Sequence, residues 1–448
     1  MRLIRAFTIT ILATLLVPSV LSQSKDLTEG IKLRAKGDSC LFSHSDIASA
    51  ASYYQKAHDF FVKNKNRDGI AATLSDMASI AVQSFNFSAA IRQYKDILRK
   101  YPSVHDSVSF HINQTLFGIY ALTQQIDSAA YYESKCEALL VKGHNLVSLD
   151  IVDYNNSQSM KSMAEMDIYK QEAYLLKSLK ILKGLKSDSR AAFYLPIIYN
   201  NLAYCYLQQQ EYAAAKSYFQ QALITNKDAI CYFNLAECHL QLNEFDQAFA
   251  AISTGWNYYT HLVKHNPKQR QLPSEEYYYR ALGSYYSKIG SFEKAIASYR
   301  ATIELKPKIT NTHLYNAYLG LAEIYTARKQ YKEVLSQCQQ VLIHTCKGFN
   351  SANIYQNPNI EQVKEMYAFV HAIYRKTKAF QQLSEQTHQV KDFQSVINCA
   401  TIAIQVVDQY KRQANSVEAK IFLSDGLYTL YENAMEAAYQ LNILTQKP

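Results

Sequence analysis

The sequence is poor in glycine and proline. Its 448 residues include 12 glycines and 8 prolines. All-β folds, collagen-like chains and glycine-rich phosphate-binding loops need more turn-forming residues than this, so these classes are disfavoured. Neither a P-loop motif nor a GxGxxG motif occurs. The sequence therefore offers no recognisable loop for a nucleotide or a dinucleotide cofactor.

Paired cysteine motifs and metal-binding motifs are also missing. There are eight cysteines but no CxxC, which argues against zinc ribbons and redox motifs. We interpret the cysteines as small core residues, although an exported protein can still pair some of them across helices. His261 and His265 share a helix face, but no HExxH glutamate and no third ligand accompany them. We therefore predict no metal and no cofactor.

Nothing in the sequence singles out catalytic residues. Ser, His and Asp are spread along the chain without a recognisable set. Cys238 and His239 are adjacent, but neighbouring side chains on a helix point about 100° apart. We interpret His239 as a packing residue, and we predict that the protein is not an enzyme.

The charge is positive but not concentrated. Lys and Arg number 47 and Asp and Glu number 38, which leaves a net charge of +9. A nucleic-acid surface needs basic residues gathered on one face. The spread of the charge therefore argues against a nucleic-acid partner.

The N-terminus has the three parts of a secretory signal peptide. Arg2 and Arg5 precede an apolar stretch from Ala6 to Val17, and small residues follow at Val20 and Ser22. We predict cleavage between Ser22 and Gln23 and a periplasmic or extracellular location in a bacterium. The alternatives are an uncleaved anchor and a buried helix. No later segment reaches 18 continuous apolar residues, so no integral membrane segment is expected after cleavage.

Tyrosine is abundant, at 36 residues, and it recurs in a fixed pattern. In residues 279–307, Tyr279, Leu282, Gly283 and Tyr286 lie at helical spacing, and Gly290 then interrupts the helix. A second run at helical spacing consists of Phe292, Ala295, Tyr299 and Thr302, and it precedes Pro307. The pattern predicts two amphipathic helices joined by a tight turn. Gly283 and Ala295 are small enough to let the two helices approach closely.

Similar pairs of runs occur elsewhere in the chain. In each copy the second helix contains aromatic or small residues. The first helices carry a small residue at equivalent positions, namely Ala78, Gly118, Ala203, Ala236 and Ala322. The steps between copies range from 33 to 47 residues, so longer helices or insertions are expected, notably around His261 to Pro273.

This pattern resembles the tetratricopeptide repeat family, in which an aromatic residue, Leu, Gly or Ala, and Tyr are followed by Ala, an aromatic residue and Ala, and then Pro. Segment 276–309 matches almost completely, and segment 196–229 nearly so. The resemblance implies an all-α, right-handed superhelical solenoid of stacked antiparallel helix pairs. We predict a signal peptide at 1–22, N-terminal repeats at 23–190, well-matched central repeats at 191–345 and divergent helical repeats at 346–448.

A solenoid of this kind binds protein or peptide ligands on its concave surface. Asparagines at the places of Asn201 and Asn234 bond the ligand backbone in peptide-binding members of the family. The alternative is that these amides bond the neighbouring repeat, since a buried amide must find some partner. The candidate binding residues are Asn200, Asn201, Tyr204, Asn234, Glu237, Tyr277, Arg280 and Glu323. Their mixed charge does not match the basic clamp that other members use for a C-terminal carboxylate.

The C-terminal 50 residues resemble the region that precedes the caspase-like CHAT domain in bacterial TPR–CHAT proteins. The matching positions are Asp408, Ser416, Ala419, Lys420, Leu423, Tyr431, Glu432 and Ala434. We expect an exported, non-catalytic scaffold for a protein or peptide. The alternative is the sensory or regulatory part of a larger effector, either a CHAT protease or a signalling kinase.

Overall fold

The structure is a computed structural model. It describes residues 27–446 except 44–45, 85, 124, 143–147, 166, 186–188, 266–274, 307–310, 414–419, 421–423 and 425–426. The predicted signal peptide therefore lies outside the described residues, as do Pro307 and most of the 416–423 motif. The chain divides into two compact units, unit 1 at Met1–Cys205 and unit 2 at Tyr206–Pro448.

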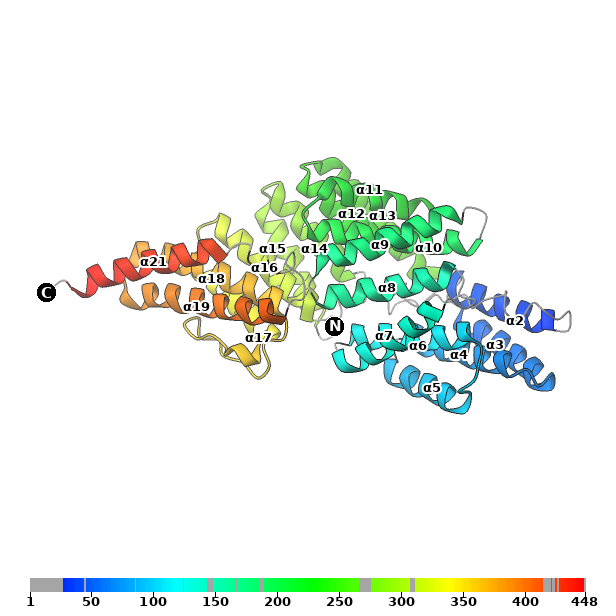
Figure 1. The fold of residues 1–448 in the computed structure, drawn as a ribbon. Helices are drawn as coiled ribbons and strands as arrows, with labels where there is room; N and C mark the ends of the chain where they lie inside the picture. The colour runs from blue at the N-terminus through cyan, green and yellow to red at the C-terminus, as the bar shows by residue number, and fades with distance from the viewer. Residues whose placement is uncertain are drawn as a thin grey trace. The chain divides into compact units, whose positions relative to one another are not determined.

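Unit 1 is built from consecutive helices (Figure 1). The helices are α2 (Thr28–Asp38), the π-helical turn η2 (Ser39–Ser43), α3 (Ile47–Lys63), α4 (Arg67–Gln83), α5 (Phe87–Lys100), α6 (Asp106–Leu122), α7 (Ile126–Lys142), α8 (Ser148–Ala164), α9 (Ile168–Gly184) and α10 (Ser189–Gln208), whose last turn belongs to unit 2.

Unit 2 continues in the same way, and its last helices α18, α19 and α21 lie side by side at the orange-to-red end of the chain (Figure 1). Its elements are α11 (Tyr212–Thr225), α12 (Ala229–Gln241), α13 (Phe245–His265), α14 (Glu275–Lys288), α15 (Phe292–Glu304), α16 (Asn311–Ala327), α17 (Tyr331–Thr345), the 3-10 turn η4 (Ile360–Gln362), α18 (Met366–Thr387), α19 (Val390–Gln413) and α21 (Leu427–Thr445).

The predicted all-α fold of stacked antiparallel helix pairs is confirmed. Each predicted pair appears as two neighbouring helices, such as α14 with α15 and α16 with α17. Within the described ranges there is no β-strand, and the Cys346–Val363 bridge is isolated. None of the helices in those ranges has the length and apolarity that a bilayer crossing requires.

Several of the turns inside the pairs close with the same hydrogen bond. The amide of Ser291 donates to the carbonyl of Tyr286 at 2.8 Å, and that of Gln330 donates to Tyr325 at 2.9 Å. This bond spans five residues and is the Schellman closure of a helix C-terminus. The residue before the second helix's N-cap has positive φ, at 74° for Gly290 and 57° for Lys329. The interruption predicted at Gly290 is therefore confirmed.

Small residues bring the helices of unit 2 into close contact, as the sequence predicts for Gly283. A Cβ atom added at Gly283 would lie 2.7 Å from the Tyr299 ring, and one added at Gly320 would lie 2.3 Å from it. Tyr299 is 5% exposed, and its hydroxyl lies 3.2 Å from the Ser284 hydroxyl. The ring of α15 thus packs against the glycines of α14 and α16.

One connection in unit 2 is much longer than the turns. Residues 346–365 join α17 to α18 and contain only the short turn η4. The buried Lys376 ammonium of α18 donates to the Gln356 carbonyl at 3.0 Å and to Asn357 Oδ1 at 2.8 Å. It also donates to Gln339 Oε1 of α17 at 2.7 Å. A buried cation surrounded by three oxygen acceptors therefore fixes this connection to both helices.

Candidate functional site

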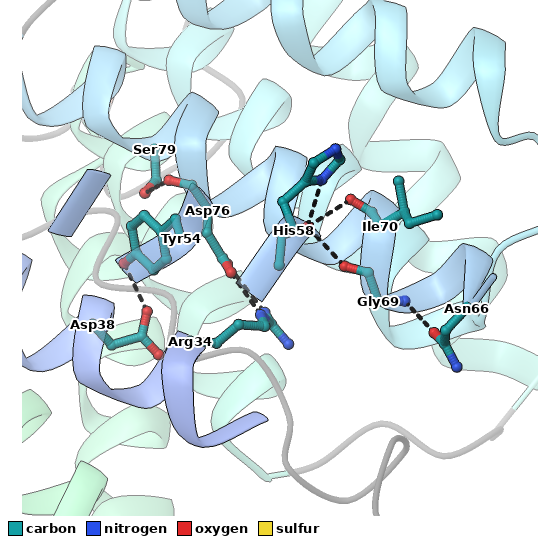
Figure 2. Close-up of polar contacts among 10 residues, drawn as sticks. Arg34, Asp38, Tyr54, His58, Asn66, Gly69, Ile70, Asp76 and Ser79 are labelled. Carbon is teal, nitrogen blue, oxygen red and sulfur yellow. Dashed lines mark hydrogen bonds and ion pairs between the residues drawn. The ribbon is translucent and has the colours of Figure 1, made fainter. Parts of the chain in front are cut away.

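The first helices of the pairs in unit 1 are joined by buried polar contacts. Figure 2 shows the contact of α2 with α4, in which Arg34 faces Asp76. Arg34 Nε donates to Asp76 Oδ2 at 2.6 Å, and Nη2 donates to Oδ1 at 3.0 Å. Both residues are at most 3% exposed. A two-point contact of this kind holds the carboxylate in one orientation.

A second carboxyl group completes this cluster. Tyr54 of α3 donates its hydroxyl to Asp38 Oδ1 at 2.8 Å (Figure 2). Burial, and then the negative charge of Asp76, raises the pKa of Asp38 to about 8. One cation and two carboxyl groups are electrically neutral when one proton is kept, so at neutral pH Asp38 is the group that holds it.

Further along unit 1, the same kind of contact joins α6, α8 and α10. Gln114 Nε2 donates to Ser157 Oγ at 2.6 Å, and Tyr194 donates its hydroxyl to Asp153 Oδ2 at 3.1 Å. Asn201 Nδ2 donates to Asn156 Oδ1 at 3.2 Å. We call the buried contacts Arg34–Asp76, Gln114–Ser157, Tyr194–Asp153 and Asn201–Asn156 the polar seam. The seam occupies polar side chains that would otherwise be available to a ligand.

The corresponding contacts in unit 2 are looser. His313 Nε2 of α16 lies 3.8 Å from Glu276 Oε1 of α14. Arg375 Nη2 of α18 lies 3.9 Å from Glu323 Oε2 of α16, and the Glu323 side chain is 60% exposed. These distances exceed those of a hydrogen bond. The polar groups on α16 and α18 are therefore less fully occupied by one another than those of the seam.

Unit 2 contains a cavity of about 1010 Å³ along α18. One wall is α18 itself, from Met366 to Gln382, and the others come from the end of α10, α16, Tyr331 of α17, α19 and α21. Gln208 and Gln210 also line it. Its size is at the upper end of the range that small-molecule and peptide-anchor pockets occupy. We call it the α18 cavity.

A polar stripe of α18 faces this cavity. Tyr367, His371, Arg375, Lys378 and Gln382 follow one another at intervals of three and four, which places them on one side of the helix. The Tyr367 and His371 rings lie 4.4 Å apart, and the Lys378 ammonium lies 4.6 Å from the Tyr374 ring. Burial, and then the charge of Arg375, lowers the pKa of His371 to about 4. His371 is therefore neutral at pH 7.

An apolar surface adjoins the stripe. Met366, Val407, Leu427 and Leu430 also line the cavity and are each at most 8% exposed, and Val370 is half-buried. The cavity is thus lined by two cations, Arg375 and Lys378, and by an apolar surface, which we call its floor.

Of the eight residues predicted to bind a ligand, Glu237, Arg280 and Glu323 lie near one another, since the charges of all three influence the pKa of Tyr299. Asn201 is fully buried in the polar seam, and Tyr204 packs against the apolar cluster of unit 1. Asn200 is half-buried on the same helix. The five others belong to unit 2, where Glu323 lines the α18 cavity.

The remaining predicted residues lie on α12 and α14. Asn234 is 7% exposed, and Glu237 accepts a hydrogen bond from Gln241 Nε2 at 2.7 Å. Tyr277 is 6% exposed and makes an edge contact with the His313 ring, and the Arg280 guanidinium lies 5.4 Å from the Tyr277 ring. The structure therefore brings Tyr277 and Arg280 together, and neither is among the residues that line the α18 cavity.

The residues of the α18 stripe were not predicted as binding residues, because residues 346–448 match the repeat pattern weakly. A signal was present in the spacing of His371, Arg375, Lys378 and Gln382, which is four, three and four residues. This is the polar counterpart of an amphipathic pattern.

The thiols and the histidine next to Cys238 have the environment of packing residues. Burial raises the pKa of Cys238 to about 12, so a nucleophilic thiolate is disfavoured there. His239 is 7% exposed, and its Nδ1 contacts a Glu244 carboxylate oxygen. Over the ranges that the structure describes, no three His, Cys, Asp or Glu side chains are grouped as a metal site would require.

Comparisons with known proteins support a repeat protein. Residues 276–309 match the tetratricopeptide repeat family, and residues 178–254 match the family described as anaphase-promoting complex, cyclosome, subunit 3. No curated protein matches the chain at a significant level. The match of residues 276–309 independently supports the resemblance of the repeat pattern to the tetratricopeptide family.

Two solved structures share the fold at low sequence identity. The apo form of RapI matches with 9% identity and a TM-score of 0.50, and it covers 84% of this chain and 99% of its own. A Rap protein complexed with competence and sporulation factor matches with 12% identity, a TM-score of 0.51 and the same two coverages. At these identities the likeness concerns the fold alone. The chain therefore has the all-α fold of tetratricopeptide-like helical repeats.

Proposed function

We propose that this protein is a non-catalytic scaffold that binds a protein or peptide on the inner surface formed by the first helices of its pairs, with the α18 cavity as the main contact site. The observation that carries the proposal is the cavity of about 1010 Å³ beside exposed and half-exposed polar side chains of α18. The Rap protein solved with competence and sporulation factor lends support, since it holds a bound factor on a similar fold.

The proposal is tested by filling the cavity. Val370→Trp adds a large ring to the lining, whereas Val390→Trp adds the same ring at a position that is 50% exposed and outside the lining. A partner captured from the envelope fraction should be retained by the wild type and by Val390→Trp and lost with Val370→Trp. Equal retention by all three proteins would show that the cavity is not the binding site.

Export is a separate part of the proposal. It is supported by the basic, apolar and small-residue segments at 1–22. When the full chain is expressed in a bacterium, the mature protein should appear in the periplasm or the medium, and N-terminal sequencing should begin at Gln23. A product that retains Met1 and stays with the cytosol would contradict export.

A second candidate function is the regulatory region of a larger effector, as the resemblance to the CHAT-preceding region implies. The observation that favours it is the outer face of α21, where Tyr428, Tyr431, Met435 and Tyr439 are between 47% and 74% exposed. A following domain would cover such a face. Reading the gene beyond the codon for Pro448 tests this, since an open frame that encodes an effector domain is required.

A further inference from the structure

We propose that the α18 cavity selects an acidic peptide segment with apolar neighbours, and that it holds a carboxylate of this segment between Arg375 and Lys378. This inference rests on the proposed function and adds the chemical class of the ligand. Three properties of the cavity lining support it: the weak pairing of its cations, the spacing of these cations and the apolar surface beside them.

The two cations are poorly neutralised by the protein itself. The Arg375 guanidinium has its nearest carboxylate at 3.9 Å, on a Glu323 side chain that is largely in solvent. Lys378 lies over the Tyr374 ring, and within the described part of the chain no carboxylate forms an ion pair with it. In the polar seam, by contrast, Arg34 has a carboxylate at 2.6 Å. A ligand carboxylate at hydrogen-bond distance would neutralise Arg375 and Lys378 more fully than the Glu323 side chain does.

The spacing of these cations suits a single carboxylate. Residues three apart on a helix have Cβ atoms about 5–6 Å apart, so the two long side chains can converge on one group. An arginine offers a planar pair of donors, and a lysine adds a third donor from another direction. His371 precedes Arg375 by one turn and is neutral at pH 7, so it adds no charge that would broaden the site towards polyanions.

The floor of the cavity requires more than a charge. Val370, Met366, Val407 and Leu430 form an apolar surface beside the stripe. A ligand that presented only carboxylates would leave this surface in contact with water, whereas an apolar side chain next to the acid would bury it. The cavity volume admits a few residues of an extended segment. Gln208 and Gln381 at the lining are suited to bond the backbone of such a segment.

The test uses the purified full chain and a displayed library of short random peptides. Enriched peptides should carry Asp or Glu within two positions of Leu, Ile, Phe or Tyr. A synthetic peptide from this set should bind about tenfold more weakly when its acid is replaced by the isosteric amide, which corresponds to about 1.4 kcal/mol. Raising the salt concentration should weaken the wild-type interaction.

Variants of the protein locate the carboxylate. Arg375→Gln and Lys378→Gln should each lower the affinity for the peptide by about tenfold. The matched control Lys332→Gln, on the exposed side of α17, should leave the affinity unchanged. Circular dichroism and thermal unfolding establish that each variant is folded before its affinity is compared.

The outcomes separate this inference from the function on which it rests. If Val370→Trp abolishes binding, the carboxylate assignment is overturned by enriched peptides without acidic residues, or by equal binding of the wild type, Arg375→Gln and Lys378→Gln. If no peptide is enriched, or if Val370→Trp binds as well as the wild type, the peptide-binding function of the cavity fails as well.

Discussion

The two units use polar residues on their first helices in different ways. In unit 1, the polar seam joins α2 to α4 and α6 to α8 to α10 at distances of 2.6–3.2 Å. Helix α6 is buried along almost its whole length. In unit 2, Arg375 of α18 lies 3.9 Å from Glu323 of α16, and both residues line the α18 cavity. In the same repeat architecture, polar side chains can therefore either bond neighbouring helices or stay available to bind a partner.

Among the substitutions measured at a single pH, the largest expected effect comes from opening the seam. Arg34→Met leaves Asp76 buried without its cation, and breaking a buried pair in this way costs about 3–5 kcal/mol. Hydrogen exchange should show loss of protection in α2 to α4, and urea unfolding should give the change in the free energy of unfolding. The control is Arg99→Met, whose side chain is 82% exposed and pairs with Asp96 at the surface. If Arg34→Met costs no more than this control, the seam does not stabilise unit 1.

The counterpart in unit 2 is the close packing around Tyr299. Gly320→Ala places a Cβ atom 2.3 Å from this ring, and overpacking of that kind costs about 1–3 kcal/mol. Gly184→Ala is the matched control, because a Cβ atom at Gly184 meets nothing within 4 Å. Thermal unfolding should show a lower midpoint for the first variant and an equal or higher one for the second. Equal midpoints would mean that the ring moves aside without cost.

The proton on Asp38 should make unit 1 sensitive to pH. Because the folded pKa is raised to about 8, the folded state keeps a proton that the unfolded state releases above about pH 4. The free energy of unfolding should therefore fall as the pH rises from 4 to 8, by at most about 1.4 kcal/mol for each pH unit, and level off above 8. Asp38→Asn should remove this slope in urea unfolding measured across the same window. A slope that persists in the variant would assign it to another group.

The smallest expected effect concerns a predicted binding residue. Asn201→Ala removes the donor to Asn156, which should cost about 1 kcal/mol of stability. Because Asn201 is buried in the seam, the affinity for a peptide selected by the α18 cavity should not change. Fluorescence anisotropy with the selected peptide measures this. A tenfold loss of affinity would place Asn201 in the binding site after all and weaken the contrast between the units.

The repeat pattern predicted the helix pairs because small residues and rings carry the packing. Gly283 and Tyr299 are in contact as their spacing indicates, and Gly290 adopts the positive φ that its position requires. The equivalent turns at Gln210, Asn243 and Lys329 also have positive φ. Their side chains do not signal this, since the Schellman hydrogen bond imposes the conformation on whichever residue occupies the place.

The candidate site was harder to predict than the fold. An amide on a first helix looks the same in sequence whether it faces a ligand or a neighbouring helix, and Asn201 turned out to bond Asn156. Arg375 and Lys378 lie in a segment whose repeat pattern is weak, so their common orientation becomes visible only once α18 is placed beside α16 and α21. Tertiary contacts, which the local pattern does not contain, decide both cases.

The burial of the Lys376 ammonium protects this amine from chemical modification. Its three oxygen partners enclose it, and burial lowers the pKa of its side chain, so the amine stays out of reach of acylating reagents while residues 346–365 remain docked. Exposed amines such as Lys332 react regardless. The rate at which Lys376 is acylated would thus report the rate at which residues 346–365 detach from α17 and α18.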